Sequence, residues 1–178
     1  MEHITIVMND TEMQRTIDRL AFQVIENHGE CEDVVLIGIQ RRGVDIAARL
    51  KQVLDERLGA SVEFGSLDIN LYRDDWTTLD AQPMINTTDI PATIEGKTLL
   101  LVDDVLFTGR TIRAALEALL DHGRPARIEL MVLVDRGYRE LPICANYVGK
   151  QVDSSFEEQV DVLVREIDGK DAVLLKRA

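Results

Sequence analysis

Two adjacent carboxylates and a loop rich in hydroxyls lie between an apolar run and a helical pattern, and this stretch offers the clearest chemistry in the chain. Leu99 to Val102 are all apolar, and Asp103 and Asp104 follow them directly. Such an uninterrupted run is typical of a strand buried on both faces of a parallel sheet. Open α/β sheets bind ligands at the carboxyl ends of their strands. We therefore expect both carboxylates to emerge at a ligand site.

The residues after the carboxylates form a short loop that suits a phosphate group. Thr108, Gly109 and Thr111 precede a helical pattern that begins at Ile112. Hydroxyls and backbone N–H groups at a helix N-terminus bind phosphate oxygens, and carboxylates bind the diol of a sugar. Together they point to a phosphorylated ribose. An ordinary helix start, at which the helix dipole favours acidic residues, is an equally good interpretation of these residues alone.

The whole string from Leu99 to Thr111 resembles, position by position, the phosphoribosyl-diphosphate (PRPP) motif of type I phosphoribosyltransferases. It is not a Walker loop, because the Gly-Lys-Ser/Thr ending is absent. It is not the dinucleotide fingerprint either, because no Gly-x-Gly-x-x-Gly follows a strand. The resemblance favours phosphate binding over the ordinary helix start.

The composition is that of an ordinary globular protein. The chain has 178 residues, of which 46% are apolar and 29% charged, so residues 1–178 suit one domain with a substantial core. The net charge of −12 opposes nonspecific attraction to nucleic acid, although it is compatible with a local basic patch. Without a membrane-spanning apolar stretch or a signal-peptide pattern, we expect a cytoplasmic protein with no membrane partner. Cys31, Cys144 and the histidines show no metal-ligand spacing, so we expect no metal site built by the protein.

Segments of strand and helix character alternate along the chain, which predicts an α/β fold with a doubly wound, mainly parallel sheet. Thr11 to Gln14 matches a capping box at the start of a helix, and Asp168-Gly169 resembles the turn of a hairpin. The segment from Arg73 to Pro91 is polar and without a lasting period, as long functional or disordered loops are. The expected strands are 34–39, 62–72, 97–102, 128–134, 160–167 and 172–175, and the expected helices are 13–25, 44–54 and 112–120.

Two further segments narrow the resemblance. Leu-Tyr-Arg-Asp-Asp from Leu71 to Asp75 precedes the PRPP motif, and a segment from Val134 to Ile143 containing Arg-Glu-Leu-Pro-Ile follows it. In this order the three segments resemble the family of bifunctional pyrimidine-operon attenuation regulators and uracil phosphoribosyltransferases. The likeness runs from about the first helix to the hairpin expected near the C-terminus. It implies a type I phosphoribosyltransferase sheet with a mobile lid loop, a small hood, and a homodimer or larger homo-oligomer.

The resemblance implies transfer of phosphoribose from PRPP to uracil, giving UMP and pyrophosphate. The leaving pyrophosphate gathers negative charge while the ribose becomes oxocarbenium-like, so catalysis rests on positioning and electrostatic stabilisation. No covalent nucleophile is needed. Mg²⁺ is expected, carried mainly by the oxygens of PRPP, because this hard cation keeps few protein ligands.

The same resemblance assigns roles to individual residues. Asp103 and Asp104 match the carboxylates that face the ribose, and Arg73 matches an arginine at the root of the lid that meets pyrophosphate on closure; these three are the expected catalytic residues. The expected wall around uracil is Val134, Asp135 and Arg136. The expected PRPP contacts are Arg41, Arg42, Gly43, Asp103, Asp104, Val105, Leu106, Phe107, Thr108, Gly109, Arg110 and Thr111.

The resemblance also implies binding of a pyrimidine-operon leader RNA, with UMP as effector. Several residues depart from the family pattern: Phe22 and Tyr138 stand where histidine is common, Cys144 where arginine is common, and Asp153 where proline is common. Because these departures fall near surfaces implicated in RNA attenuation, and the net charge is negative, we expect weaker and more salt-sensitive RNA binding than is usual for the family. The basic residues expected at the RNA face are Arg15, Arg19, Arg139 and Lys150.

Other interpretations stay open. The protein could be chiefly a nucleotide-sensing RNA regulator with little catalysis, or a phosphoribosyltransferase that binds no RNA. A receiver domain also places paired acids at strand ends, but it needs neither the Thr-Gly-Arg-Thr loop nor the long polar segment. Arg41 and Arg42 also fit the exposed first turn of a helix, and Arg73 fits a solvated charge run. Trp76, the only tryptophan, has no assigned role.

Overall fold

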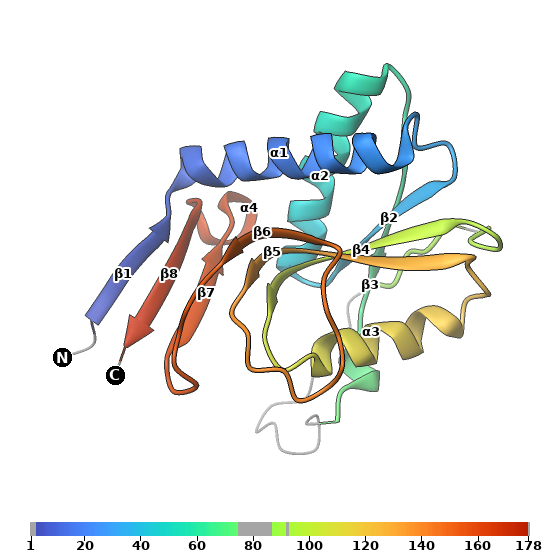
Figure 1. Ribbon diagram of the computed structural model, residues 1–178. Helices are drawn as coiled ribbons and strands as arrows, with labels where there is room; N and C mark the ends of the chain where they lie inside the picture. Colours follow the sequence, from blue (N-terminus) through green and yellow to red (C-terminus); the bar gives the residue numbers. More distant parts are fainter. Residues whose placement is uncertain (1–2, 75–86, 92, 178) are drawn as a thin grey trace.

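The centre of the fold is a sheet of five strands: β2 (Val34–Ile39), β3 (Glu63–Leu67), β4 (Thr98–Leu106), β5 (Arg127–Asp135) and β6 (Tyr147–Gln151). They lie in the order β3-β2-β4-β5-β6, and every neighbouring pair is parallel (Figure 1). The computed structural model describes residues 3–74, 87–91 and 93–177. The expected parallel α/β sheet is confirmed, whereas most of the expected lid, with Trp76, lies outside the described residues.

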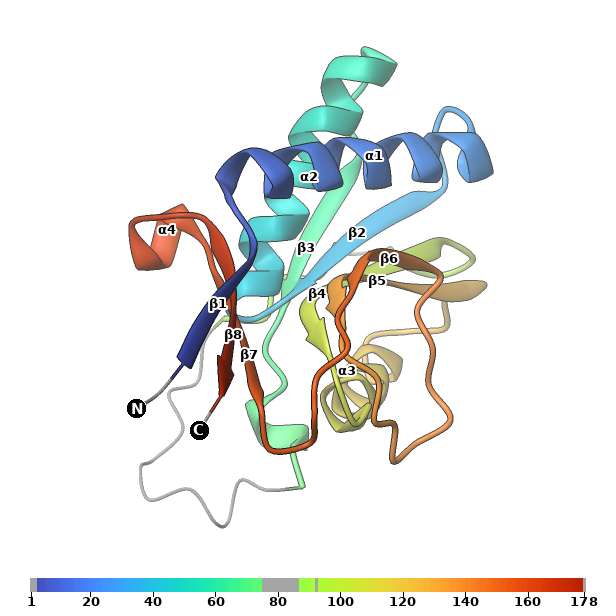
Figure 2. The same ribbon diagram turned by 60° about the vertical axis from the view of Figure 1, so that its left-hand side comes forward.

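Helices cover both faces of this sheet. α1 (Asp10–His28) and α2 (Arg42–Leu58) lie on one face, and α3 (Arg110–Leu120) lies on the other (Figures 1 and 2). Leu100 and Val102 of β4 belong to the core cluster on the α1–α2 side, and Leu99 and Leu101 to the cluster on the α3 side. A strand covered on both faces must be apolar at every position, which explains the run that the sequence shows. No helix in the described part of the chain is long and apolar enough to span a membrane.

A second, smaller sheet forms the expected hood. Its strands are β1 (His3–Met8), β8 (Ala172–Arg177) and β7 (Gln159–Leu163), antiparallel in the order β1-β8-β7 (Figure 2). The hairpin turn expected at Asp168-Gly169 is instead one turn of helix, α4 (Arg165–Asp168). It forms because the Asp168 carboxylate accepts the Val164 N–H at 2.9 Å and Gly169 takes a φ of 73°.

Three local expectations differ from the structure. The capping box of α1 is formed by Asn9 and Glu12, each of whose side chains accepts the other's backbone N–H, and not by Thr11 and Gln14. The strand expected to reach residue 72 ends at residue 67, and a short 3₁₀ helix (Asn70–Tyr72) follows it. The two aspartates after Val102 lie inside β4 rather than beyond its end, because β5 keeps pairing with β4 as far as Leu106.

Candidate active site

The predicted PRPP residues gather around two adjoining cavities at the carboxyl end of the parallel sheet. The first, of about 250 Å³, lies against the loop between β4 and α3, and we call it the loop cavity. The second, of about 230 Å³, is lined by Asp103, Asp104 and the start of α2, and we call it the carboxylate cavity. Arg73 and Thr111 line both. The structure therefore brings together three segments that are far apart in the sequence.

The two carboxylates occupy different environments. Asp103 is 5% exposed, and its Oδ1 accepts the Asp104 N–H at 2.9 Å. Asp104 is partly exposed, and its Oδ1 accepts the Val105 N–H at 2.8 Å. Burial, and then the charge of Asp104, raise the pKa of Asp103 well above its usual range, while the charge of Arg73 opposes the shift. A buried carboxylate beside a second one favours a ligand that brings hydroxyl donors or positive charge.

We expect Asp103→Asn to raise the free energy of unfolding by about 1 kcal/mol at neutral pH, or Tm by about 2–4 °C. The pKa of Asp103 is raised in the folded state, so between the unfolded and the folded pKa the folded wild type holds a proton that the unfolded chain has released. Its stability therefore falls as the pH rises above about 4, and the variant escapes this loss.

Thermal unfolding of both proteins from acid to neutral pH measures this difference. Asp33→Asn is the control, because the Asp33 side chain is 86% exposed and lies at the opposite end of the sheet. A Tm difference between Asp103→Asn and the wild type that does not widen with pH would contradict the prediction.

The loop between β4 and α3 has the features of an anion site. Gly109 is the N-cap of α3 with a φ of 93° and has no side chain to cap the helix, and the Thr108 hydroxyl accepts the Arg110 N–H at 3.4 Å. Residues 108–112 line the loop cavity, so the first-turn N–H groups border it. The Thr108 carbonyl accepts the N–H groups of Glu140 and Leu141 at 2.9 and 3.2 Å, which fixes the loop from behind. The loop is therefore firmly held, and its N-cap residue contributes no capping side chain.

Arg110 links this loop to two other segments. Its Nε donates to Glu140 at 2.6 Å and its Nη1 donates to Asp74 at 2.7 Å. Asp74 lies at the root of the expected lid, and Glu140 follows β5 along the chain. Arg110 belongs to the PRPP motif, Asp74 to the segment 71–75 and Glu140 to the segment 134–143. The Arg110 side chain thus connects the three segments on which the family resemblance rests.

The start of α2 and the residue before it place two arginines at the carboxylate cavity, and a glycine lies directly behind them. Arg41 and Arg42 line the cavity, and the Gln40–Arg41 peptide bond is cis. A Cβ on Gly43 would lie 2.6 Å from the Val102 carbonyl oxygen, so only glycine allows the helix to start this close to β4. Arg42 is not simply exposed: its guanidinium forms two hydrogen bonds with Asp168 of the hood.

Arg73 follows an anchored turn. The preceding residue, Tyr72, is held twice by α3: Arg113 donates to its carbonyl at 2.9 Å, and its hydroxyl donates to Asp121 at 2.5 Å. The root of the expected lid is therefore fixed to the helix that starts at the loop cavity. Arg73 can reach both cavities from this position.

The three residues predicted to surround uracil differ in their environment. Val134 is fully buried, whereas Asp135 and Arg136 line a third cavity of about 300 Å³, which we call the rim cavity. The Arg136 guanidinium lies 4.0 Å from the centre of the Phe107 ring, and burial lowers its pKa. It donates to Ser154 Oγ at 3.2 Å and to the Ser155 carbonyl at 3.1 Å, so its main contacts hold the hood connection against β5.

The four residues predicted for RNA are not equivalent. Arg15 and Arg19 are exposed on α1, Arg19 donates to the Gly149 carbonyl, and Lys150 donates to the Val7 carbonyl at 2.8 Å. These three lie on neighbouring elements. Arg139 is turned inward, where its guanidinium donates to Asp135 and to the carbonyls of residues 107, 137 and 143. Arg139 thus braces the rim cavity, which it lines together with Gln151, the residue after Lys150.

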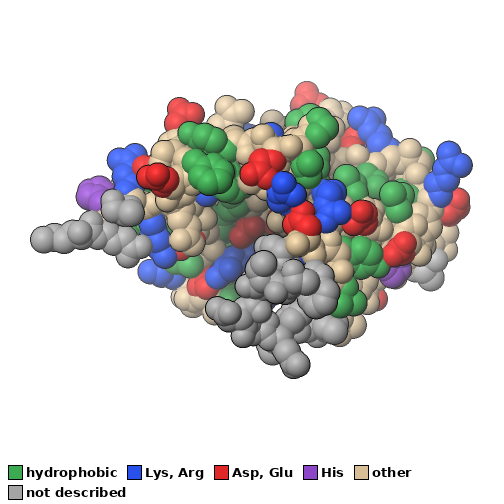
Figure 3. Space-filling model, turned by 90° about the horizontal axis from the view of Figure 1, so that it is seen from below, with side chains coloured by type: hydrophobic (Ala, Val, Ile, Leu, Met, Phe, Trp, Pro, Cys, Tyr) green, Lys and Arg blue, Asp and Glu red, His purple; other side chains and the backbone are tan. Residues whose placement is uncertain are grey.

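Two features of the site were not predicted from the sequence. Phe107, Tyr138 and Phe156 form an aromatic cluster with ring centres 5.4–6.2 Å apart, and Tyr138 and Phe156 remain about half exposed. Asp168 reaches Arg42 from the hood. Neither could be recognised locally, because the partners come from separate segments. On the face shown in Figure 3, Lys/Arg and Asp/Glu side chains are interspersed, so local groups rather than a broad field must attract an anion.

The chain is similar in sequence to known proteins along nearly its whole length. The family model described as a phosphoribosyl transferase domain matches residues 4–165. A protein of Clostridium novyi named bifunctional protein PyrR is 51% identical over 173 residues, covering 97% of each chain. A protein of the same name from Chloroflexus aurantiacus is 50% identical over 171 residues, covering 96% of this chain and 94% of its own.

Solved structures share the fold at low sequence identity. The hypoxanthine phosphoribosyltransferase of Trypanosoma cruzi matches with a TM-score of 0.72 and 18% identity, covering 96% of this chain and 95% of its own. A hypoxanthine-guanine phosphoribosyltransferase of Bacillus anthracis matches with a TM-score of 0.70 and 18% identity, covering 99% of each chain. These likenesses concern the arrangement of strands and helices.

Proposed function

Because the chain belongs to the phosphoribosyltransferase family and, within it, to the bifunctional PyrR proteins, we propose that it transfers phosphoribose from PRPP to uracil, giving UMP and pyrophosphate. One observation carries most of this proposal. Asp103 and Asp104 lie directly beside the helix N-terminus at Gly109, so groups for a ribose diol and for its phosphate adjoin each other.

The cavities suggest how PRPP would lie. The 5′-phosphate would occupy the loop cavity against residues 108–111, and the ribose hydroxyls would face Asp103 and Asp104. The diphosphate would then point towards Arg41, Arg42 and Arg73, which line the carboxylate cavity. As the bond from the anomeric carbon to the diphosphate oxygen breaks, the arginines would stabilise the leaving charge and the carboxylates the cationic ring. Uracil, entering from the rim cavity, would form the new bond through N1 and lose its N1 proton.

Mg²⁺ fits this arrangement as a companion of the substrate. Within residues 3–74, 87–91 and 93–177, no three His, Cys, Asp or Glu side chains converge into a metal site. Two adjacent carboxylates can hold ribose hydroxyls or water, while Mg²⁺ would take most of its oxygen ligands from PRPP. When bound, the cation neutralises charge on the diphosphate.

The test is the reaction itself. Purified protein is incubated with PRPP, Mg²⁺ and radiolabelled uracil, and UMP is measured against parallel reactions with hypoxanthine, guanine or cytosine. We expect product from uracil at least about 100-fold faster than from the other bases, because a site that pairs with polar base edges discriminates strongly. Product from a purine alone would overturn the choice of uracil, and no product from any base would overturn the transferase assignment for this chain.

A second function, UMP-responsive binding of a pyrimidine-operon leader RNA, is favoured by the position of Arg15, Arg19 and Lys150 on neighbouring elements α1 and β6. Basic side chains of this kind bind the RNA backbone, and unpaired bases supply sequence choice. We expect selective but weak binding that falls steeply with salt, because the net charge of −12 repels a polyanion.

Titration of leader RNA against a scrambled hairpin, at two salt concentrations and with or without UMP, tests this function. Arg15→Glu should weaken binding and lower the salt dependence by about one unit of slope or more, because it removes one phosphate contact. Arg124→Glu, on the connection between α3 and β5, is the control, because it makes the same two-unit change of charge away from Arg15. Equal binding of both RNAs would reject the regulatory function, and tight binding at physiological salt would contradict the predicted weakness.

A further inference from the structure

We propose that Asp168, on the small sheet, is a positioning residue that holds Arg42 in the orientation needed to bind the diphosphate of PRPP. The proposal rests on the proposed function, because it names a residue that acts on the same site from outside it. Asp168 lies on α4, and Arg42 is the first residue of α2. The small sheet would thereby set the affinity of the main domain for its phosphorylated substrate.

The contact is a paired ion bridge. Arg42 Nε donates to Asp168 Oδ2 at 3.1 Å, and Arg42 Nη2 donates to Asp168 Oδ1 at 2.9 Å. The Arg42 side chain is 34% exposed and that of Asp168 is 17% exposed, so solvent screens the bridge only partly. Two parallel hydrogen bonds fix the plane of the guanidinium as well as its position. Arg42 therefore has a defined direction before any ligand binds.

The carboxylate itself is fixed. Asp168 Oδ2 also accepts the Val164 N–H at 2.9 Å, and the Asp168 N–H donates to the Val164 carbonyl at 2.7 Å. The bond to Arg42, more than any other contact, lowers the pKa of Asp168. A carboxylate that is ionised and locked to its own turn cannot follow a moving arginine. It therefore acts as a stationary reference for Arg42.

Asp168 stands behind the cavity rather than in it. Arg42 lines the carboxylate cavity together with Asp104, whereas Asp168 is absent from the described lining. The charge of Asp104 also acts on Arg42. Without Asp168, the guanidinium would be drawn towards Asp104, which faces the ribose hydroxyls in the proposed function. Asp168 would thus keep a diphosphate-binding arginine apart from a ribose-binding carboxylate.

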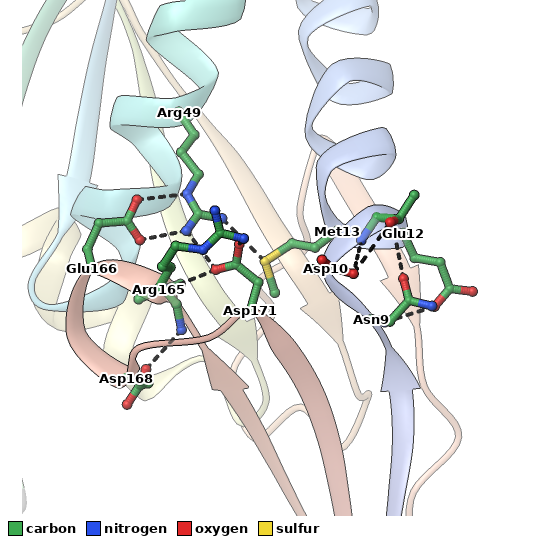
Figure 4. A network of polar contacts seen from close by, with 11 residues as sticks. Asn9, Asp10, Glu12, Met13, Arg49, Arg165, Glu166, Asp168 and Asp171 are labelled. Carbon is green, nitrogen blue, oxygen red and sulfur yellow. Dashed lines mark hydrogen bonds and ion pairs between the residues drawn. The ribbon is translucent and has the colours of Figure 1, made fainter.

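The same junction contains a second ion bridge that serves as a matched control. Arg49, two turns further along α2, donates to Glu166 at 2.6 and 2.9 Å and to Asp171 at 2.7 Å (Figure 4). Both bridges join α2 to the α4 region, but only the one at Arg42 borders the carboxylate cavity. A variant of Glu166 therefore loosens the same junction without removing the partner of Arg42.

The experiment compares Asp168→Asn with Glu166→Gln in the full chain. Asparagine can still accept the Val164 N–H but cannot hold the guanidinium as a charged partner. We expect Asp168→Asn to raise KM for PRPP about tenfold with kcat within about twofold, the pattern of lost binding rather than lost chemistry. Glu166→Gln should leave both constants within about twofold of the wild type. KM for uracil should stay unchanged in both variants.

Direct binding of Mg²⁺-pyrophosphate, measured by calorimetry, separates this inference from the proposed reaction. The dissociation constant should rise about tenfold in Asp168→Asn and stay near the wild-type value in Glu166→Gln. Equal effects of the two variants on KM for PRPP and on pyrophosphate binding, with equal losses in Tm, would overturn the positioning role. A wild-type chain that binds pyrophosphate but makes no UMP would overturn the proposed function alone.

Discussion

Replacing both Asp103 and Asp104 with asparagine is expected to lower kcat/KM for phosphoribosyl transfer at least about 100-fold, equivalent to about 2.7 kcal/mol of transition-state stabilisation. Both carboxylates lie in β4 at the carboxylate cavity, and Asp103 is almost fully buried there. The negative charge shared by this carboxylate pair acts strongly on a developing cation, because little water screens it. Asparagine keeps the shape and the hydrogen-bond acceptor but removes the charge.

Initial rates with PRPP and uracil measure this loss, and far-ultraviolet circular dichroism checks the fold. The matched control is the double variant Glu32→Gln/Asp33→Asn, which also removes two adjacent negative charges. These residues precede β2, at the end of the sheet opposite the cavities. A double variant at residues 103 and 104 with near-wild-type kcat/KM would remove the carboxylates from the catalytic machinery.

Gly43→Ala is expected to be the most disruptive small substitution in the site. The added Cβ would lie 2.6 Å from the Val102 carbonyl oxygen and 3.2 Å from Asp103 Cα, both backbone atoms of the central strand. Neither can move without breaking the pairing of β4 with its neighbours, so α2 must shift instead. We expect a loss of about 1–3 kcal/mol in the free energy of unfolding and a KM for PRPP raised at least about tenfold, because Arg42 moves with the helix start.

Gly59→Ala is the control that tests whether the rise in KM for PRPP in Gly43→Ala results from the close contact between α2 and β4. Gly59 ends the same helix with a φ of 65°, and a Cβ there meets no atom within 4 Å. Its substitution should cost about 1 kcal/mol through backbone strain alone, with KM for PRPP unchanged. Urea denaturation and PRPP titration of both variants supply the comparison. Equal KM values in the two variants would refute the role assigned to close packing at residue 43.

Predictions from the sequence succeeded where the physics is local. The apolar run before Asp103 implied a strand covered on both faces, and β4 is such a strand. The helix predicted after the loop is present but begins at Arg110, two residues before the predicted start at Ile112. The capping box of α1 begins at Asn9, two residues before the predicted Thr11. Both residue types suit an N-cap, and the end of β1 at Met8 selects Asn9.

Predictions were harder where partners come from distant segments. Arg139 stands in a motif that suggested an exposed basic residue, but four acceptors from residues 107, 135, 137 and 143 turn it inward. Asp168 looked like a turn residue, and nothing near it in the sequence indicates Arg42. The strand β1 was missed because it is mostly exposed and its pairing partner, β8, lies far along the chain.

That pairing also dictates an order of assembly. A ribosome releases residues 3–8 long before it has made residues 172–177, yet each segment needs the other to form the small sheet. The parallel sheet and its helices have their partners earlier, so a nascent chain can complete the central core while its first strand waits unpaired. The small sheet, together with the bridge from Asp168 to Arg42, therefore closes after the central core during synthesis. A newly made chain gains its fully ordered diphosphate site only after residues 172–177 have been synthesised.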